Sequence, residues 1–165
     1  MEVKQNFDSL LKYQIKKRIL MQLNLNLRFD IFLGMRANGE WNNDMMFFQI
    51  ESKVPNWYKL TAKGKPPQPR YLHTMNYCWD LSCLVVFGGR SEHLEESQKQ
   101  FYFNDIWLFQ IQNFQWWQVE YRKVVPEVRH WHVSGIYRTK FMIFGGIGVK
   151  GIWSPNTYII ELIQD

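Results

Sequence analysis

Apolar and polar residues alternate strictly from Leu23 to Ile31, where every leucine, phenylalanine or isoleucine is separated by an asparagine, arginine or aspartate. A period of two predicts a β-strand with one buried face. Further apolar segments bounded by turn-forming residues predict strands at residues 43–50, 57–60, 71–78, 83–87, 105–111, 116–121, 140–146 and 156–163. Residues 79–82 are predicted to form a tight turn, and residues 63–69 and 90–103 are predicted to form loops. The chain is therefore predicted to be all-β.

The N-terminal segment has a different period. Phe7, Leu11, Ile15 and Ile19 recur every four residues, and the lysines of the segment lie off this stripe. The spacing predicts a short amphipathic helical arm over residues 1–22. Such an arm either packs on the edge of the domain or, because it is basic, binds a membrane surface or a partner protein.

Several landmarks recur along the chain at intervals of about 59 residues. The segment CLVVFGG (Cys83–Gly89) returns as KFMIFGG (Lys140–Gly146), which places the closing glycines 57 residues apart. Three other landmarks move with it: Arg70-x-x-His73 and Arg129-x-x-His132, Asn43-Asp44 and Asn104-Asp105, and Trp57 and Trp116-Trp117. Periods of this size indicate that one supersecondary unit is repeated.

The order of these landmarks resembles the kelch repeat. The matching residues are Pro69, Arg70, His73, Gly88, Gly89, Asn104, Asp105, Trp107 and Trp117 in the central copy, and Arg129, His132, Gly145, Gly146 and Tyr158 in the third. The first copy is degenerate, with Leu33-Gly34 in place of the double glycine. The resemblance implies four-stranded antiparallel blades of a β-propeller, in which the double glycine permits a tight turn and a close approach of neighbouring backbone. It also implies that the arginine and tryptophan join one blade to the next, so these residues are predicted to be structural.

The predicted fold is an incomplete kelch-type β-propeller with a short N-terminal helical arm. The kelch-repeat region spans 23–165, with blades at approximately 23–62, 69–122 and 128–165, the last lacking its fourth strand. Propellers usually contain at least four blades. A blade face of five large apolar side chains without its neighbour forgoes burial worth on the order of 10 kcal/mol. We therefore expect a fragment of a longer propeller, a truncated product, or self-association that completes the propeller.

Of the net charge of +5, +4 lies in residues 1–28, at the N-terminal end of the chain. Residues 1–28 hold six basic and two acidic residues, and the other 137 hold 14 basic and 13 acidic residues. The repeat region is not a basic surface, which argues against nucleic acid as a partner. The sequence shows no secretory pattern, no run of 18 apolar residues and only two cysteines, which favours a cytoplasmic protein without a membrane span.

Three candidate chemical sites are weak. Gly146-Ile-Gly148-Val-Lys-Gly151 has the spacing of a nucleotide-binding loop, but a new strand follows it instead of the required helix. His130-x-His132 has the spacing of two metal ligands, but His132 occupies the repeat position of His73. Cys78 and Cys83 flank a hairpin turn, where a reducing compartment favours free thiols over a disulfide. We therefore predict no catalytic residue, no metal and no cofactor.

Binding is predicted in the loops of one rim, because long loops on a rigid scaffold commonly carry it. The candidate partner-binding residues are Arg36, Glu40, Arg90, His93, Glu95, Glu96, Lys150 and Trp153. The predicted function is a non-catalytic scaffold or adaptor for other proteins. The alternatives are a fragment of a kelch-propeller enzyme, resembling galactose oxidase or a sugar epimerase, and a non-functional gene fragment.

Overall fold

The computed structural model describes residues 28–31, 34–35, 41–49, 54, 56–92, 100–121 and 124–162, which form two compact units. The first unit contains strands β1 to β5 and residues 68–70, and the second contains residues 61–67 and everything from Tyr71 onward. The predicted arm at residues 1–22 lies outside the described residues. All regular elements described are strands, apart from one short 3-10 turn.

The first unit holds an antiparallel sheet with the order β1-β4-β5, formed by Arg28–Ile31, Met45–Gln49 and Asn56–Leu60. Phe47 and Tyr58 are paired across β4 and β5, and their rings stack with centroids 5.1 Å apart. A two-residue ladder joins β2 (Gly34–Met35) to β3 (Trp41–Asn42). The strands predicted near residues 43–50 and 57–60 are thus confirmed.

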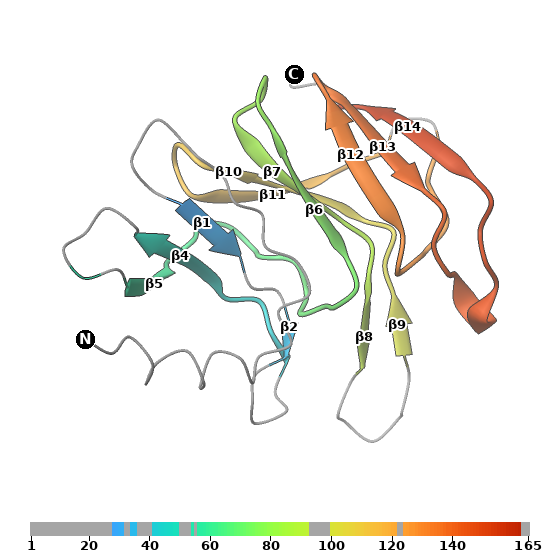
Figure 1. The fold of residues 1–165 in the computed structure, drawn as a ribbon, viewed down its shortest axis with the longest axis horizontal. Helices are drawn as coiled ribbons and strands as arrows, with labels where there is room; N and C mark the ends of the chain where they lie inside the picture. Colours follow the sequence, from blue (N-terminus) through green and yellow to red (C-terminus); the bar gives the residue numbers. More distant parts are fainter. Residues whose placement is uncertain are drawn as a thin grey trace. The chain divides into compact units, whose positions relative to one another are not determined.

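The second blade is a four-stranded antiparallel sheet with the order β11-β10-β7-β6 (Figure 1). Its strands are β6 (Thr74–Cys78), β7 (Cys83–Phe87), β10 (Ile106–Gln110) and β11 (Gln115–Val119). All five residues of β7 are buried, which is the reason its sequence is continuously apolar instead of alternating. The four-stranded blade predicted from the central repeat is confirmed.

The segment 90–103 differs from its prediction as a plain loop. Arg90–Glu92 (β8) and Gln100–Tyr102 (β9) form an antiparallel ladder that projects from the blade as a hairpin (Figure 1). The aromatic residues at 101–103 give this end of the segment a strand preference that its polar middle hides.

The third blade has three described strands with the order β12-β13-β14. They are Val133–Tyr137, Lys140–Phe144 and Thr157–Glu161, and the 3-10 turn η1 (Val149–Gly151) lies between the last two. The strands predicted at residues 140–146 and 156–163 are confirmed with slightly shorter bounds. The glycine-rich segment 146–151 includes the 3-10 turn η1, and the next regular element is the strand β14. Among the described residues no α-helix follows the segment, although a nucleotide-binding loop would require one.

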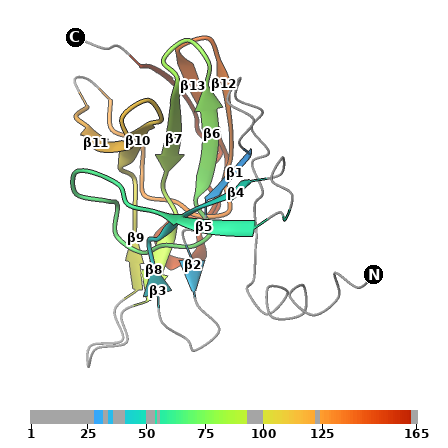
Figure 2. The ribbon, with the colours of Figure 1, turned by 90° about the vertical axis from the view of Figure 1, so that its left-hand side faces the viewer.

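The core of the second unit lies between these two blades. Phe87 on β7 and Phe141 on β13 are fully buried, and their rings meet edge to face with centroids 6.0 Å apart. Cys78, Cys83, Val85, Ile106, Ile143 and Leu162 complete the buried cluster. The edge strands β6 and β12 lie side by side in both views (Figure 1 and Figure 2). One face of each sheet is therefore buried against the other blade.

The double glycines are required by backbone conformation and by space. Gly88 and Gly89 have φ of +64° and +92°. A Cβ on Gly89 would lie 2.8 Å from the carbonyl oxygen of Tyr71, and one on Gly88 would lie 2.8 Å from that of Arg129. The second glycine of the pair thus touches its own blade, and the first touches the next one. No other residue fits both requirements.

We predict that Gly146→Ala destabilises the protein far more than Gly151→Ala. Both glycines have positive φ, at +98° and +73°, so each alanine is strained by about 1 kcal/mol or more. Only at Gly146 does the new Cβ also collide, at 2.8 Å from Cβ of His132, whereas Gly151 has no atom within 4 Å. Chemical denaturation should show a loss about 2 kcal/mol larger for Gly146→Ala. Equal losses would contradict the close approach.

Candidate functional site

The histidine of the third repeat, His132, lies at the seam between the second and third blades. His132 Nε2 is 2.8 Å from Oγ1 of Thr74 on β6, and its ring meets Phe87 edge to face with centroids 5.0 Å apart. Asn76 also bonds Ser134, and the Cys78 thiol donates to the carbonyl oxygen of Arg138 at 3.2 Å. His132 is therefore engaged in contacts with the second blade. No group of three or more metal-ligating side chains occurs among the residues described.

The prediction that the repeat arginine joins neighbouring blades is wrong for the Arg129 guanidinium. This fully buried group donates to the carbonyl oxygens of Glu127, Gly145 and Asn156, all in its own blade, and it lies 4.9 Å from the Tyr158 ring centroid. The connection between blades is made instead by the Arg129 backbone, whose carbonyl accepts from Gly89 N at 2.8 Å. Arg70 repeats the local pattern and donates to the carbonyl of Gln68 at 3.1 Å.

The sequence predicts Trp117 as the tryptophan of the repeat, but the tryptophan that packs into the blade is Trp116. Trp117 is 57% exposed, whereas Trp116 is 2% exposed and packs on Phe109 and Trp107. Side chains alternate along a strand, so only one of two adjacent tryptophans can face the core. Sequence spacing could not choose between them, because the choice depends on the register of β11 with β10.

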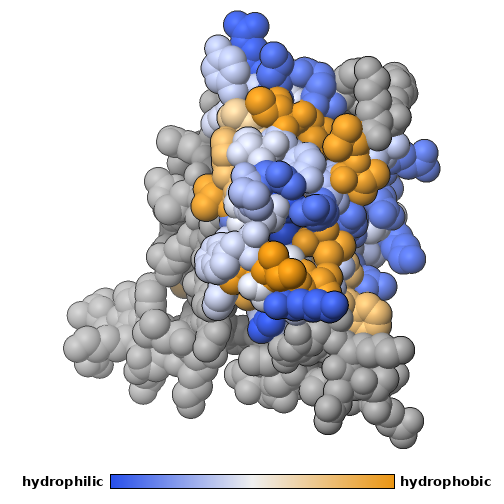
Figure 3. Space-filling view, turned by 90° about the vertical axis from the view of Figure 1, so that its right-hand side faces the viewer, coloured by the Kyte–Doolittle hydropathy of each residue, from blue (hydrophilic) through white to orange (hydrophobic). Residues whose placement is uncertain are grey.

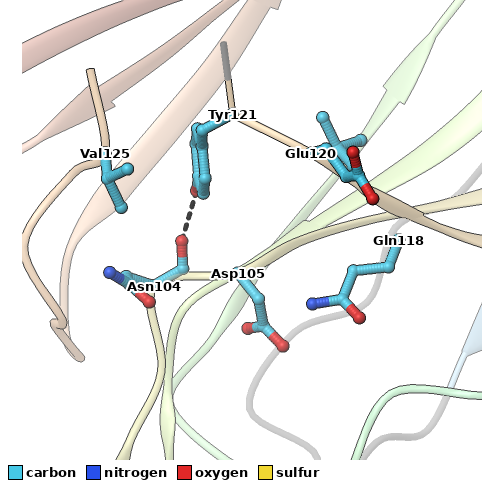
Figure 4. A pocket seen from close by; sticks show the side chains of 7 residues that line it. Asn104, Asp105, Gln118, Glu120, Tyr121 and Val125 are labelled. Atoms are coloured by element: carbon cyan, nitrogen blue, oxygen red, sulfur yellow. Dashed lines mark hydrogen bonds between the residues drawn. The ribbon is translucent and has the colours of Figure 1, made fainter. Parts of the chain in front are cut away.

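Asn104 and Asp105 lie just before β10 and form hydrogen bonds with neighbouring segments. Asp105 accepts a bond from Trp107 Nε1 at 2.6 Å, and Asn104 binds the carbonyl of Pro126 at 2.9 Å. The Tyr121 hydroxyl points to the Asn104 carbonyl and donates to it (Figure 4). Burial, aided by the charge of Asp105, raises the pKa of Tyr121.

A cavity of about 490 Å³ lies beside this pair and is lined by Asn104, Asp105, Gln118, Val119, Glu120, Tyr121 and Val125 (Figure 4). Asp105 and Glu120 are its two carboxyl residues, but Asp105 is already bonded to Trp107 and Glu120 is exposed to solvent. The lining supplies no nucleophile with an adjacent base. We therefore do not assign a reaction to this cavity.

Cys78 and Cys83 are paired across the β6–β7 hairpin and both are free thiols. They are 0% and 1% exposed. Burial, followed by the proximity of Cys78, raises the pKa of Cys83 to about 12, and burial also raises the pKa of Cys78. Thiolates are the reactive form, so this pair is chemically inert at neutral pH.

The predicted partner-binding loops are partly described. Arg90, Lys150 and Trp153 are placed, whereas Arg36, Glu40, His93, Glu95 and Glu96 lie outside the described residues. The β8–β9 hairpin and η1 project from the same end of the two blades (Figure 1). Arg90 lies over the Tyr71 ring at 4.8 Å, so it is held at the base of this rim and its guanidinium is not displayed at the tip.

The loop from β13 to β14 exposes apolar side chains, and backbone hydrogen bonds fix its conformation. Gly148 N donates to the carbonyl of Ile152, and Ser154 N donates to that of Gly146, each at 2.9 Å. Within this frame Ile152 is 66% exposed and Trp153 is 67% exposed. Lys150 has a φ of +64° at the centre of η1. The hydrogen bonds thus fix the backbone that carries these two exposed apolar side chains.

The sequence analysis missed an aromatic group that adjoins this loop. His130 packs between Tyr102 and Trp131, with ring centroids 5.3 and 5.7 Å away, and Trp131 is 56% exposed. Burial, together with the Arg90 charge, lowers the pKa of His130, so its ring is neutral at pH 7. A backbone ladder joins His130 to Ile147 and Ile147 to Trp153. The aromatic density of residues 101–103 and 130–132 was the available signal.

Comparison with known proteins now identifies the class. Residues 24–164 match the family model described as the KLHDC2/KLHL20/DRC7 Kelch-repeats domain, so the chain belongs to this kelch-repeat family. It is 27% identical over 122 residues to Dynein regulatory complex subunit 7 of Chlamydomonas reinhardtii, covering 73% of this chain and 10% of that protein. It is 29% identical over 140 residues to Adagio-like protein 1 of Oryza sativa subsp. japonica, covering 84% and 21%.

Solved structures show the same fold. The structure of YjhT superposes with a TM-score of 0.51 and 22% identity over 64% of this chain and 28% of that chain. The chain thus has the fold of kelch-type β-propeller blades and spans only a small part of the length of its relatives. Among the helices of the described residues, none is long and apolar enough to cross a membrane.

We predict that Arg129→Met costs about 3 kcal/mol of unfolding free energy or more. The substitution removes the hydrogen bonds that the buried guanidinium donates to the carbonyl oxygens of Gly145 and Asn156, and a hydrogen bond from a charged group contributes about 1.5–3 kcal/mol. Arg138→Met is the matched control, because Arg138 is exposed and its nearest ring lies 5.9 Å away. The control should lose less than about 0.5 kcal/mol in the same denaturation experiment. A mild effect at Arg129 would refute its role.

We predict that Cys83 makes the fold sensitive to alkali. In the unfolded chain this thiol ionises near 9, whereas in the folded chain it stays protonated up to about 12. The unfolded state therefore holds fewer protons between these values, and stability falls as pH rises, by up to about 1.4 kcal/mol per unit. Unfolding titrations from pH 8 to 11 should give a shallower decline for Cys83→Ala. Identical slopes would contradict the assignment.

Proposed function

We propose that this chain is a non-catalytic interaction scaffold or adaptor that holds another protein on the rim formed by β8–β9, Trp131 and residues 147–154. The observation that carries the proposal is the exposure of Ile152 and Trp153 on a loop whose backbone is fixed by hydrogen bonds. Tryptophans in rigid surroundings are typical of energetic hot spots in protein interfaces. Lys150 and Arg90 add positive charge to this end of the blades.

The relatives support a role in assemblies. One of them is named as a subunit of a dynein regulatory complex, and another is named Kelch domain-containing protein 3. The residues of the repeat motif make contacts within the fold. Examples are His132, Arg129 and the double glycines. Partner recognition therefore falls to the parts that differ between repeats. A cytoplasmic location is part of the proposal and agrees with two buried, free thiols.

The enzyme alternative rests on the resemblance to galactose oxidase and sugar epimerases. A copper oxidase needs tyrosine, histidine and cysteine ligands that converge, and Cys78 here donates to a backbone carbonyl inside the core. Metal analysis of the purified chain distinguishes the two readings: stoichiometric copper would overturn the scaffold proposal. A non-functional gene fragment is the remaining alternative, and a chain that shows neither folding nor partners would support it.

We predict that Trp153→Ala and Trp131→Ala each lower partner recovery at least tenfold in quantitative affinity purification with the whole chain. Loss of a hot-spot tryptophan typically costs 2 kcal/mol or more, which corresponds to about 30-fold in affinity. Trp79→Ala is the matched control, because Trp79 is 65% exposed in the β6–β7 turn at the opposite end of the blade (Figure 1).

The proposal requires a partner whose recovery survives the control but not the rim substitutions. Partners lost equally with all three variants, or retained with all three, would place binding elsewhere. Thermal unfolding of each variant should stay within a few degrees of the parent chain, because all three side chains are mostly exposed.

A further inference from the structure

A short ladder of three residues recurs at the loop end of the second and third blades. Its members, in order across the ladder, are Tyr71, Arg90 and Tyr102 in the second blade and His130, Ile147 and Trp153 in the third. His130 thus occupies the position of Tyr71, one repeat further along the sequence. The third repeat therefore carries an imidazole, which titrates near neutral pH, where the second repeat carries a phenol.

His130 lies buried at the seam between these two blades. It is 5% exposed, and its ring packs between Tyr102 of β9 and Trp131, whose ring centroids lie 5.3 and 5.7 Å away. Its backbone is fixed by two hydrogen bonds with Ile147, of 2.9 and 2.8 Å. Nδ1 of the ring is buried without a hydrogen-bond partner. At this point the β8–β9 hairpin is thus joined to the third blade by packing of the imidazole.

The charge that acts on His130 has the same sign as its protonated ring. Among the described residues this charge belongs to Arg90 of β8. The group that faces the ring from β9 is the phenol of Tyr102, and the third blade contributes Trp131 and Ile147, whose side chains do not titrate. Burial, followed by the Arg90 charge, lowers the pKa of His130 from its ordinary value of 6.5, and the Ile147 backbone opposes this shift less strongly. The ring therefore takes up a proton more readily in water than in its packed position.

A proton at this buried position has an effect that a proton at the surface lacks. Figure 3 shows hydrophilic and hydrophobic residues side by side on the surface of the third blade, and Lys140 of β13 and Glu161 of β14 are exposed. Water and salt screen charges at such positions. A second positive charge beside Arg90 in a buried contact is screened much less, so it favours an arrangement in which the His130 ring reaches water. As pH falls below 6.5, the population of this open arrangement rises by up to about tenfold per pH unit.

We propose that His130 is a pH-sensitive contact between the β8–β9 hairpin and the third blade. While its ring is neutral, it packs between Tyr102 and Trp131; once protonated, it leaves this position and the hairpin separates from the third blade there. Acidification thus loosens the rim without unfolding either sheet, because the β7–β10 and β13–β14 ladders do not involve His130. The rim is the surface proposed above for a partner protein, so affinity for that partner falls as well. This second consequence rests on the proposed function, and the first does not.

Hydrogen exchange of the whole chain without a partner tests the contact itself. Mass spectrometry at pH 7.5 and 5.5, with labelling times matched for the chemical rate of exchange, should show residues 100–103 and 128–132 exchanging about three- to tenfold faster at pH 5.5. The β7–β10 ladder is the internal control and should be unchanged. His130→Tyr carries the residue that the second repeat has at this position, and it should exchange equally at the two pH values. Unchanged exchange in the parent chain, or the same acceleration in His130→Tyr, would overturn the proposal.

A nuclear magnetic resonance titration measures the same coupling without replacing His130. Its ring should take up a proton below pH 6.5 in the parent chain, and Arg90→Gln should raise the midpoint because the like charge is removed. Arg90→Gln should also reduce the acceleration of exchange at pH 5.5. A midpoint of 6.5 or above for His130 in the parent chain would contradict the proposal.

Partner recovery tests the consequence for binding. Quantitative affinity purification with the parent chain should give about three- to tenfold less partner at pH 5.5 than at pH 7.5, and equal recovery with His130→Tyr. Recovery that is independent of pH in the parent chain would refute regulation by His130. A chain that captures no partner sensitive to Trp131→Ala at pH 7.5 would refute the proposed function, while the exchange experiment still decides on the His130 contact.

Discussion

The packing of the Gly88-Gly89 backbone against the Arg129–His132 segment holds the second unit together. Gly89 N bonds the Arg129 carbonyl, Gly88 leaves room for the His132 ring, and that ring in turn contacts Thr74 and Phe87. A Cβ on Gly88 would separate the two segments, because it would lie 2.8 Å from the Arg129 carbonyl oxygen and 2.9 Å from the His132 ring. Because both blades are fixed at this seam, the loops at their shared end are fixed as well, and the apolar faces of β7 and β13 close on each other.

The repeat motif satisfies backbone groups that the blade cannot satisfy by itself. The Arg129 guanidinium binds the carbonyl oxygen of Gly145, in the turn after β13, and that of Asn156, just before β14. A planar group with several donors suits this task better than any other side chain. The residues that identify the repeat therefore make their contacts within the fold. Under the scaffold proposal, recognition of other molecules belongs to segments that differ between the repeats of this chain, such as the β13–β14 loop.

The second unit offers two separate surfaces with different physical properties. The β13–β14 loop exposes a few large side chains on a backbone that is fixed by hydrogen bonds. Under the scaffold proposal, such a surface suits a partner protein of complementary shape. The outer face of the third blade has an apolar centre and one row, Tyr137–Lys140–Glu161, that carries a positive and a negative side chain.

The sequence by itself determined the repeat and the main strands of the blades, because these depend on local periodicity and on glycine conformation. It also predicts a structural role for His132, since its repeat position is visible. Only the tertiary structure decided that Trp116 instead of Trp117 is buried, that the Arg129 guanidinium stays within its blade, and that the ends of segment 90–103 pair as a hairpin. Each of these depends on strand register or on contacts between residues distant in sequence. Local patterns fix which residues form a strand, but not which atoms they meet across space.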